Sequence, residues 1–190
     1  IAPGYLANLI VSSDLTALPI DMVFYHGHLV GKDKQPLFSL PKPGKKTLND
    51  TVKVKPFKLE DLELKAKGST AFVIEIVPGQ IITKKRTMKV KIKNGFIVPD
   101  IQRDILKLAV VERHKRTGNI GLGLVTGFGL KSGALASSIA HDSHNIAVVG
   151  TNDADIYTAI QQVEKMQGGL AVVADGKVIA SLPLPVAGLL

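Results

Sequence analysis

Apolar and charged positions alternate most regularly over residues 87–93, where Met88, Val90 and Ile92 are separated by lysines. A period of two predicts a half-buried strand with a charged solvent face, and Asn94-Gly95 after it predicts a hairpin turn. Apolar runs bounded by turn residues predict further strands elsewhere in the chain. These strands are expected over residues 7–11, 22–30, 69–77, 134–140, 146–149, 170–174 and 177–180.

Helical spacing occurs in two segments. Between Asp100 and Lys115 apolar residues recur every three or four positions, and acidic residues suit the first turn. A second helix is expected over residues 155–166, with Asn152 or Asp153 as its cap and Gly168-Gly169 at its end. The total is about seven to nine strands and two helices, in α+β order rather than a regular βαβ alternation.

Three segments are expected along this α+β chain. Residues 1–31 predict a small group of β-strands, residues 32–49 are basic, Pro-rich and aperiodic like a linker, and residues 50–190 predict a mixed α+β domain. The chain starts without methionine and ends without a polar tail, and we interpret it as a piece of a longer polypeptide. Its 190 residues are enough for one large or two small cores.

Charge and composition narrow the possible partners and compartments. The net charge is +8, and residues 32–93 alone contain 16 Lys/Arg against 6 Asp/Glu. Such a segment can attract an anionic partner, although exposed lysines also prevent edge-to-edge aggregation of strands. The absence of cysteine excludes disulfides and Cys-ligated metals and fits a reducing cytoplasm. The apolar window 120–140 is broken by five glycines and Lys131, so no membrane-spanning helix is expected.

The most informative polar cluster is the run His141-Asp142-Ser143-His144-Asn145, which separates two apolar stretches. Polar groups held at a tight turn by flanking strands are preorganised for contact with a ligand or partner. They can bind a metal or move protons, because an imidazole beside a carboxylate titrates near neutral pH. Alternatively, Asp142 and Asn145 cap backbone amides and the histidines bond buried carbonyls. The residues leave both interpretations open.

Three other motifs favour structural interpretations. His26-x-His28 has the spacing of a metal-ligand pair on a strand, but a linker follows it instead of a long chain with further ligands. The glycine run 121–133 does not match a nucleotide-binding spacing and is expected to allow close packing of a sheet and a loop. The basic residues 84–93 lack aromatic stacking platforms and predict a solvated face.

Five motifs follow one another in order within residues 117–189 and include the polar run. They are Thr117-Gly-Asn-Ile-Gly121, Gly127-Phe-Gly-Leu-Lys-Ser-Gly-Ala134, Ser138-Ile-Ala-His-Asp-Ser-His-Asn145, Gly150-Thr-Asn-Asp153 and Leu182-Pro-Leu-Pro-Val-Ala-Gly-Leu189. Together they resemble the C-terminal domain of adenine deaminases. Residues 1–10 resemble the segment where an amidohydrolase chain leaves its barrel and enters its small β-domain, with Asn8 in place of the usual aspartate.

The resemblance implies a purine-salvage hydrolase that converts adenine to hypoxanthine and ammonia with a metal-activated water. Its divalent metal, manganese, iron or zinc, is expected in a (β/α)8 barrel of about 250 residues that is not recognisable in this chain. No catalytic residue, metal ligand or cofactor is therefore assigned here. His141, Asp142, Ser143, His144 and Asn145 are candidates for contact with substrate or with an interface.

The resemblance further implies an inactive C-terminal piece of a cytoplasmic homo-oligomer that covers the active site or mediates assembly. Its expected partners are adenine, through the parent active site, the barrel and further copies of itself, without nucleic acid or membrane. Two alternatives remain at this point: a non-catalytic scaffold, and an anion-binding or nucleic-acid-binding module built on residues 84–93.

Overall fold

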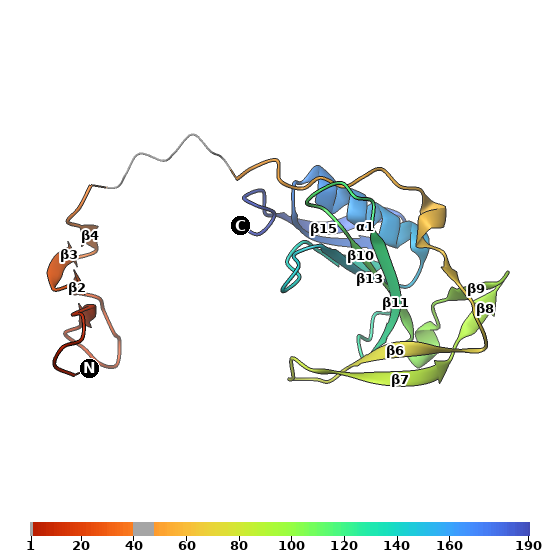
Figure 1. The fold of residues 1–190 in the computed structure, drawn as a ribbon, viewed down its shortest axis with the longest axis horizontal. Coiled ribbons are helices and arrows are strands. Elements are labelled where there is room, and N and C mark those ends of the chain that lie inside the picture. Colours follow the sequence, from red (N-terminus) through yellow and green to blue (C-terminus); the bar gives the residue numbers. More distant parts are fainter. Residues whose placement is uncertain (1, 40–47) are drawn as a thin grey trace. The chain divides into compact units, whose positions relative to one another are not determined.

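The computed structural model describes residues 2–39 and 48–190 and divides the chain into two compact units, Ile1–Lys46 and Thr47–Leu190 (Figure 1). No helix in these described ranges is long and apolar enough to cross a membrane. Strands predominate, and the single α-helix gives the mixed α+β class that the sequence predicts. The described residues hold fifteen strands, more than the sequence pattern indicates, because several predicted elements are divided or converted.

The first unit is a four-stranded antiparallel sheet in the order β1-β2-β3-β4. The prediction of one strand over residues 22–30 is wrong, because His26 and Gly27 have φ values of 50° and 80° and form a turn. The strands are β1 (Leu9–Val11), β2 (Met22–Tyr25), β3 (His28–Lys32) and β4 (Gln35–Pro36). Strand β4 lies within the segment predicted as a linker, of which residues 40–47 fall outside the described ranges.

The second unit is built on an eight-stranded sheet in the order β15-β14-β12-β13-β10-β11-β6-β7. Every neighbouring pair in it is antiparallel except β11 and β6. Its strands are β6 (Thr70–Ile76), β7 (Thr83–Lys89), β10 (Leu106–Val111), β11 (Ile120–Thr126), β12 (Ala134–Ser137), β13 (Ile146–Gly150), β14 (Gly169–Ala174) and β15 (Lys177–Pro183). A three-stranded sheet joins β5 (Leu64–Lys65), β9 (Phe96–Val98) and β8 (Lys91–Lys93).

The predicted helix over residues 100–115 is wrong. The chain forms a short 3₁₀ turn, η2 (Ile101–Arg103), and then strand β10, at the centre of the large sheet. Leu106 packs into one core cluster, whereas Ala109 and Val111 pack into another on the opposite face. Burial on both faces produces an apolar run whose spacing resembles that of a helix, so periodicity alone could not separate the two.

The alternating segment 87–93 is also divided. Val90 separates β7 from β8, which belong to different sheets, while the predicted Asn94-Gly95 turn does join β8 to β9. The strand predicted over residues 69–77 is confirmed as β6, and the predicted hairpin 170–180 is confirmed as β14 and β15.

The main core lies between one face of the large sheet and helix α1 (Asp153–Lys165), whose predicted cap at Asn152 is confirmed. The Asn152 side chain accepts a hydrogen bond from the backbone N–H of Asp155, at 2.8 Å. The other short helix is η1 (Leu59–Leu62). The buried ammonium of Lys107 lies 2.5 Å from a carboxylate oxygen of Asp153 and donates to the Leu62 carbonyl oxygen at 2.8 Å. This cation therefore joins β10, α1 and η1 inside the core.

Candidate functional site

The polar run lies in the connection between β12 and β13, which pair as an antiparallel hairpin from Ala134↔Gly150 to Ser137↔Ala147. This hairpin agrees with the strand, turn and strand that the sequence predicts. The backbone N–H of His144 donates to the Ala140 carbonyl at 2.6 Å and closes the turn. The two strands therefore present the polar residues together at one end of the large sheet.

The five candidate side chains divide into two groups by exposure. His141, Asp142 and Ser143 are exposed, whereas His144 and Asn145 are partly buried. The two imidazole rings meet edge to face, with centroids 4.9 Å apart and planes at 66°. His141 and Asp142 therefore face solvent, while His144 supports the turn from beneath.

Two residues that sequence reasoning did not single out hold the backbone of this turn. The Arg113 Nε donates to the His144 carbonyl at 2.5 Å, and His114 Nε2 lies 2.9 Å from the Ser143 carbonyl. Both terminal nitrogens of Arg113 also donate to the Ala187 carbonyl, at 3.2 Å. Burial of the guanidinium lowers the pKa of Arg113. The arginine thus connects the turn to the C-terminal segment of the chain.

Glu112 fixes the loop that follows Arg113. Its carboxylate accepts hydrogen bonds from the backbone N–H groups of His114, Lys115 and Thr117 and from the Thr117 hydroxyl, at 2.5–2.9 Å. Burial raises the pKa of Glu112, but these four hydrogen bonds outweigh it and lower the pKa to about 2. A misassigned helix hid this arrangement, because Glu112, Arg113 and His114 were expected on consecutive helical positions.

Two polar atoms at the turn lack a partner among the described residues. They are His144 Nδ1 and Asn145 Oδ1, and both are buried. A buried polar atom without a hydrogen bond costs about 1–3 kcal/mol, so such atoms are rare in a finished interior. The turn therefore retains unused hydrogen-bonding capacity beside its exposed histidine and carboxylate.

The described ranges contain no group of three or more His, Asp or Glu side chains placed to hold a metal ion. His141 and His144 approach each other through their rings, but no third ligand joins them. The residues of this chain therefore do not fit a divalent metal, and the metal implied by the resemblance needs ligands from elsewhere.

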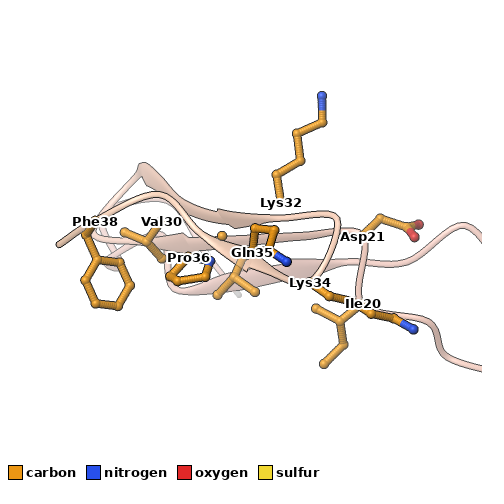
Figure 2. Close-up of a pocket in the computed structure, with 10 residues that line it drawn as sticks. Ile20, Asp21, Val30, Lys32, Lys34, Gln35, Pro36 and Phe38 are labelled. Atoms are coloured by element: carbon orange, nitrogen blue, oxygen red, sulfur yellow. The ribbon is translucent and has the colours of Figure 1, made fainter. Parts of the chain in front are cut away.

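The other sequence motifs have structural roles. His26 follows β2 and His28 begins β3, so they do not share one strand as a ligand pair would. Asn8 accepts a hydrogen bond from the His26 backbone N–H at 2.8 Å. The first unit instead offers an open trough of about 380 Å³, shown in Figure 2, that is lined mainly by apolar side chains. They include Ile20, Val23, Val30, Pro36 and Phe38.

The glycine run serves close packing, as the sequence predicts. A Cβ at Gly127 would lie 2.9 Å from the Ile76 carbonyl oxygen, and one at Gly133 would collide with the Val173 carbonyl. The carboxylate of Asp104 accepts hydrogen bonds from the backbone N–H groups of Gly127 and Gly129, at 2.7 and 2.8 Å. The protein's own carboxylate thus binds the amides that a phosphate would need.

Within the basic segment, two cations are already engaged. Arg86 forms an ion pair with Glu75 at 2.7 Å, and the Lys85 ammonium lies 3.7 Å from the centroid of the Phe72 ring. These contacts fit the solvated-face interpretation, since they use charge that an anionic ligand would otherwise meet.

Comparison with known proteins completes the picture of the site. Residues 80–190 match the model of the adenine deaminase C-terminal domain, a match that includes the polar turn and Arg113. The chain belongs to the adenine deaminase C-terminal domain family. An adenine deaminase of Dehalococcoides mccartyi is 55% identical over all 190 residues, and adenine deaminase 2 of Carboxydothermus hydrogenoformans is 45% identical over the same length. The chain spans 33% of each of these relatives.

Proposed function

We propose that this chain works as the final third of an adenine deaminase, a hydrolase that converts adenine to hypoxanthine and ammonia. The observation that carries this proposal is the similarity along its whole length, 55% identity to a protein named adenine deaminase. The proposal assigns the chemistry to the part of the enzyme outside this chain. There a divalent metal, manganese, iron or zinc, would activate the attacking water.

Within that enzyme, the turn 141–145 is proposed to lie at the active-site mouth or against the catalytic region. Support comes from its exposed imidazole and carboxylate, at His141 and Asp142, and from the two unpaired atoms of His144 and Asn145 beneath them. Adenine and a protein surface both offer hydrogen-bond donors and acceptors that can use these groups. Arg113 has a positioning role, because it holds the turn backbone without reaching its tip.

A chimera tests the proposal. The matching third of the Dehalococcoides enzyme is replaced by this chain, and release of ammonia from adenine is measured. The expected result is deaminase activity near that of the intact enzyme, and none from this chain alone. An inactive chimera with a normal melting temperature would show that the chain does not serve this enzyme.

Variants of the chimera test the turn. His141→Ala and Asp142→Asn are expected to lower kcat/KM about tenfold, the equivalent of about 1.4 kcal/mol. The matched control is Lys84→Ala, an exposed position on β7, which leaves kcat/KM unchanged. Arg113→Lys keeps the positive charge but loses the forked geometry and is expected to alter the turn and kcat/KM together. Wild-type kinetics in both turn variants would remove the turn from the site.

A scaffold role needs no separate mechanism, because covering the catalytic region and supporting assembly are compatible. The engaged Arg86 and Lys85 give no support to a nucleic-acid-binding role. The cytoplasmic location and the place in purine salvage are proposed on the basis of the family alone.

A further inference from the structure

The large sheet has one face that α1 does not cover. Cross-strand partners lie on the same face of a sheet, so the register defines its rows directly. On this uncovered face, six strands from β15 to β11 contribute two adjacent rows. The first row is Leu182, Leu170, Ser137, Ala147, Val110 and Gly121. The second row is Ala180, Val172, Leu135, Val149, Leu108 and Gly123.

The two faces differ sharply in burial. Residues of the helix face, such as Ala136, Val148 and Ala171, are fully buried beneath α1, which packs on β12, β13 and β14 (Figure 1). On the uncovered face, Leu135 and Leu170 are 39% and 37% exposed. The two rows contain one polar residue, Ser137, and no charged residue. A monomer rarely leaves such a continuous neutral, apolar surface in water.

This face also has relief that the chain's own packing does not explain. Gly121 and Gly123 lie inside strand β11 without positive φ, and an added Cβ would meet nothing closer than 3.9 Å. Glycine weakens a strand interior and often marks a place where another surface approaches closely. Gly123 also lines a pocket of about 440 Å³ that is shared with Phe72. The β11 end of the face is therefore low, whereas the β14 and β15 end carries leucines.

We propose that this face binds the same face of a second copy of the chain. In a two-fold contact, a patch must be complementary to itself. A two-fold axis parallel to the strands would place Leu170 and Leu182 of each copy over Gly121 and Gly123 of the other. The leucines at one end then fill the hollow at the opposite end, with the two sheets about 10 Å apart.

Charge and area both favour a second copy as the partner. The chain carries a net charge of +8, so two copies repel unless they meet at a neutral surface, and these rows are neutral. The first basic side chain beyond the glycine end is Lys85 on β7, which pairs with Ile74 at the rim. Two rows across six strands cover on the order of 400 Å², about half of what each partner buries in a standard interface.

The experiment is sedimentation of the 190-residue chain over a range of micromolar concentrations. The expected result is a monomer–dimer equilibrium whose dissociation constant rises at least about tenfold in Gly123→Val. The matched control is Gly68→Val, because a Cβ there also meets nothing and the residue lies in a loop outside the face. Leu170→Glu provides a second variant, which would bury a charge only in the dimer.

Thermal melting separates interface effects from misfolding. Gly123→Val is expected to melt no lower than the wild-type monomer, because valine favours an extended strand. A wild-type chain that stays monomeric at every concentration would overturn the proposal, as would unchanged dimerisation in both variants. The outcome is independent of the chimera experiment, since a monomeric but active chimera defeats only this dimer and a dimeric, inactive one defeats only the proposed function.

Discussion

The two units of this chain differ in how they are stabilised. None of the described residues in the first unit, 2–39, is buried, and apolar side chains such as Tyr5, Ile10 and Leu15 are more than 60% exposed. The second unit contains three core clusters and an eight-stranded sheet. Secondary structure can therefore form in both units, but only the second has enough buried apolar area to stabilise its own fold.

The sharpest way to test this contrast is to remove one apolar side chain from each unit. Ile160→Ala in α1 is expected to lower the free energy of unfolding by about 3–4 kcal/mol, because it leaves a cavity in the main core. Ile20→Ala, at a 49% exposed position in the first unit, should cost less than about 0.5 kcal/mol.

Urea unfolding followed by circular dichroism measures both changes. Equal losses in the two variants would contradict the contrast, since they would show that Ile20 contributes to a core as closely packed as that around Ile160.

A smaller effect is expected from the ion pair within the second unit. Asp153→Ala leaves the buried Lys107 ammonium without its carboxylate and should cost about 2–3 kcal/mol. Lys107→Met removes the charge and keeps a similar volume, so it should be nearly neutral. Asp142→Ala is the matched control, because that carboxylate is exposed at the turn and makes no ion pair within the described residues.

Chemical denaturation of the three variants gives the ranking. If Lys107→Met proves as damaging as Asp153→Ala, the ammonium contributes through its hydrogen bond to Leu62 rather than through the pair.

The smallest of these effects is a pH dependence. The pKa of Glu112 is lowered from 4.5 to about 2 in the folded chain, so the ionised carboxylate stabilises the fold above pH 4.5. That contribution is lost as the pH falls from 4.5 towards about 2, because the folded state must then take up a proton against its hydrogen bonds. Glu112→Gln should flatten this part of the stability curve and cost about 1–2 kcal/mol at pH 7.

Melting temperatures between pH 2 and pH 6 check the dependence. In the first unit the pKa of Asp14 is also lowered, by the backbone N–H groups of Ala17 and Thr16, but this carboxylate is fully exposed and Asp14→Asn serves as the control. A slope that persists unchanged in Glu112→Gln would assign the acid sensitivity to other groups.

Local signals were sufficient where one face of an element decides its structure. Asn152 before an amphipathic segment identified α1, the Asp175-Gly176 turn identified the β14–β15 hairpin, and the polar run 141–145 was correctly placed between two strands. Each of these depends on neighbours within a few residues, so the sequence contains the necessary information. The family was also recognisable in the sequence, because its motifs are short and ordered.

Long-range contacts decided the rest. Strand β10 was mistaken for a helix because its two buried faces create an apolar run, and only the sheet around it shows why both faces are apolar. Arg113 became a support of the polar turn through contacts 31 and 74 residues away, which no spacing reveals.

The sequence alone thus determined which local elements form and which family they build. The tertiary structure decided which side of the large sheet is covered and which polar atoms at the turn lack a partner. These properties arise from register and packing between distant strands, and neither leaves a local pattern in the chain.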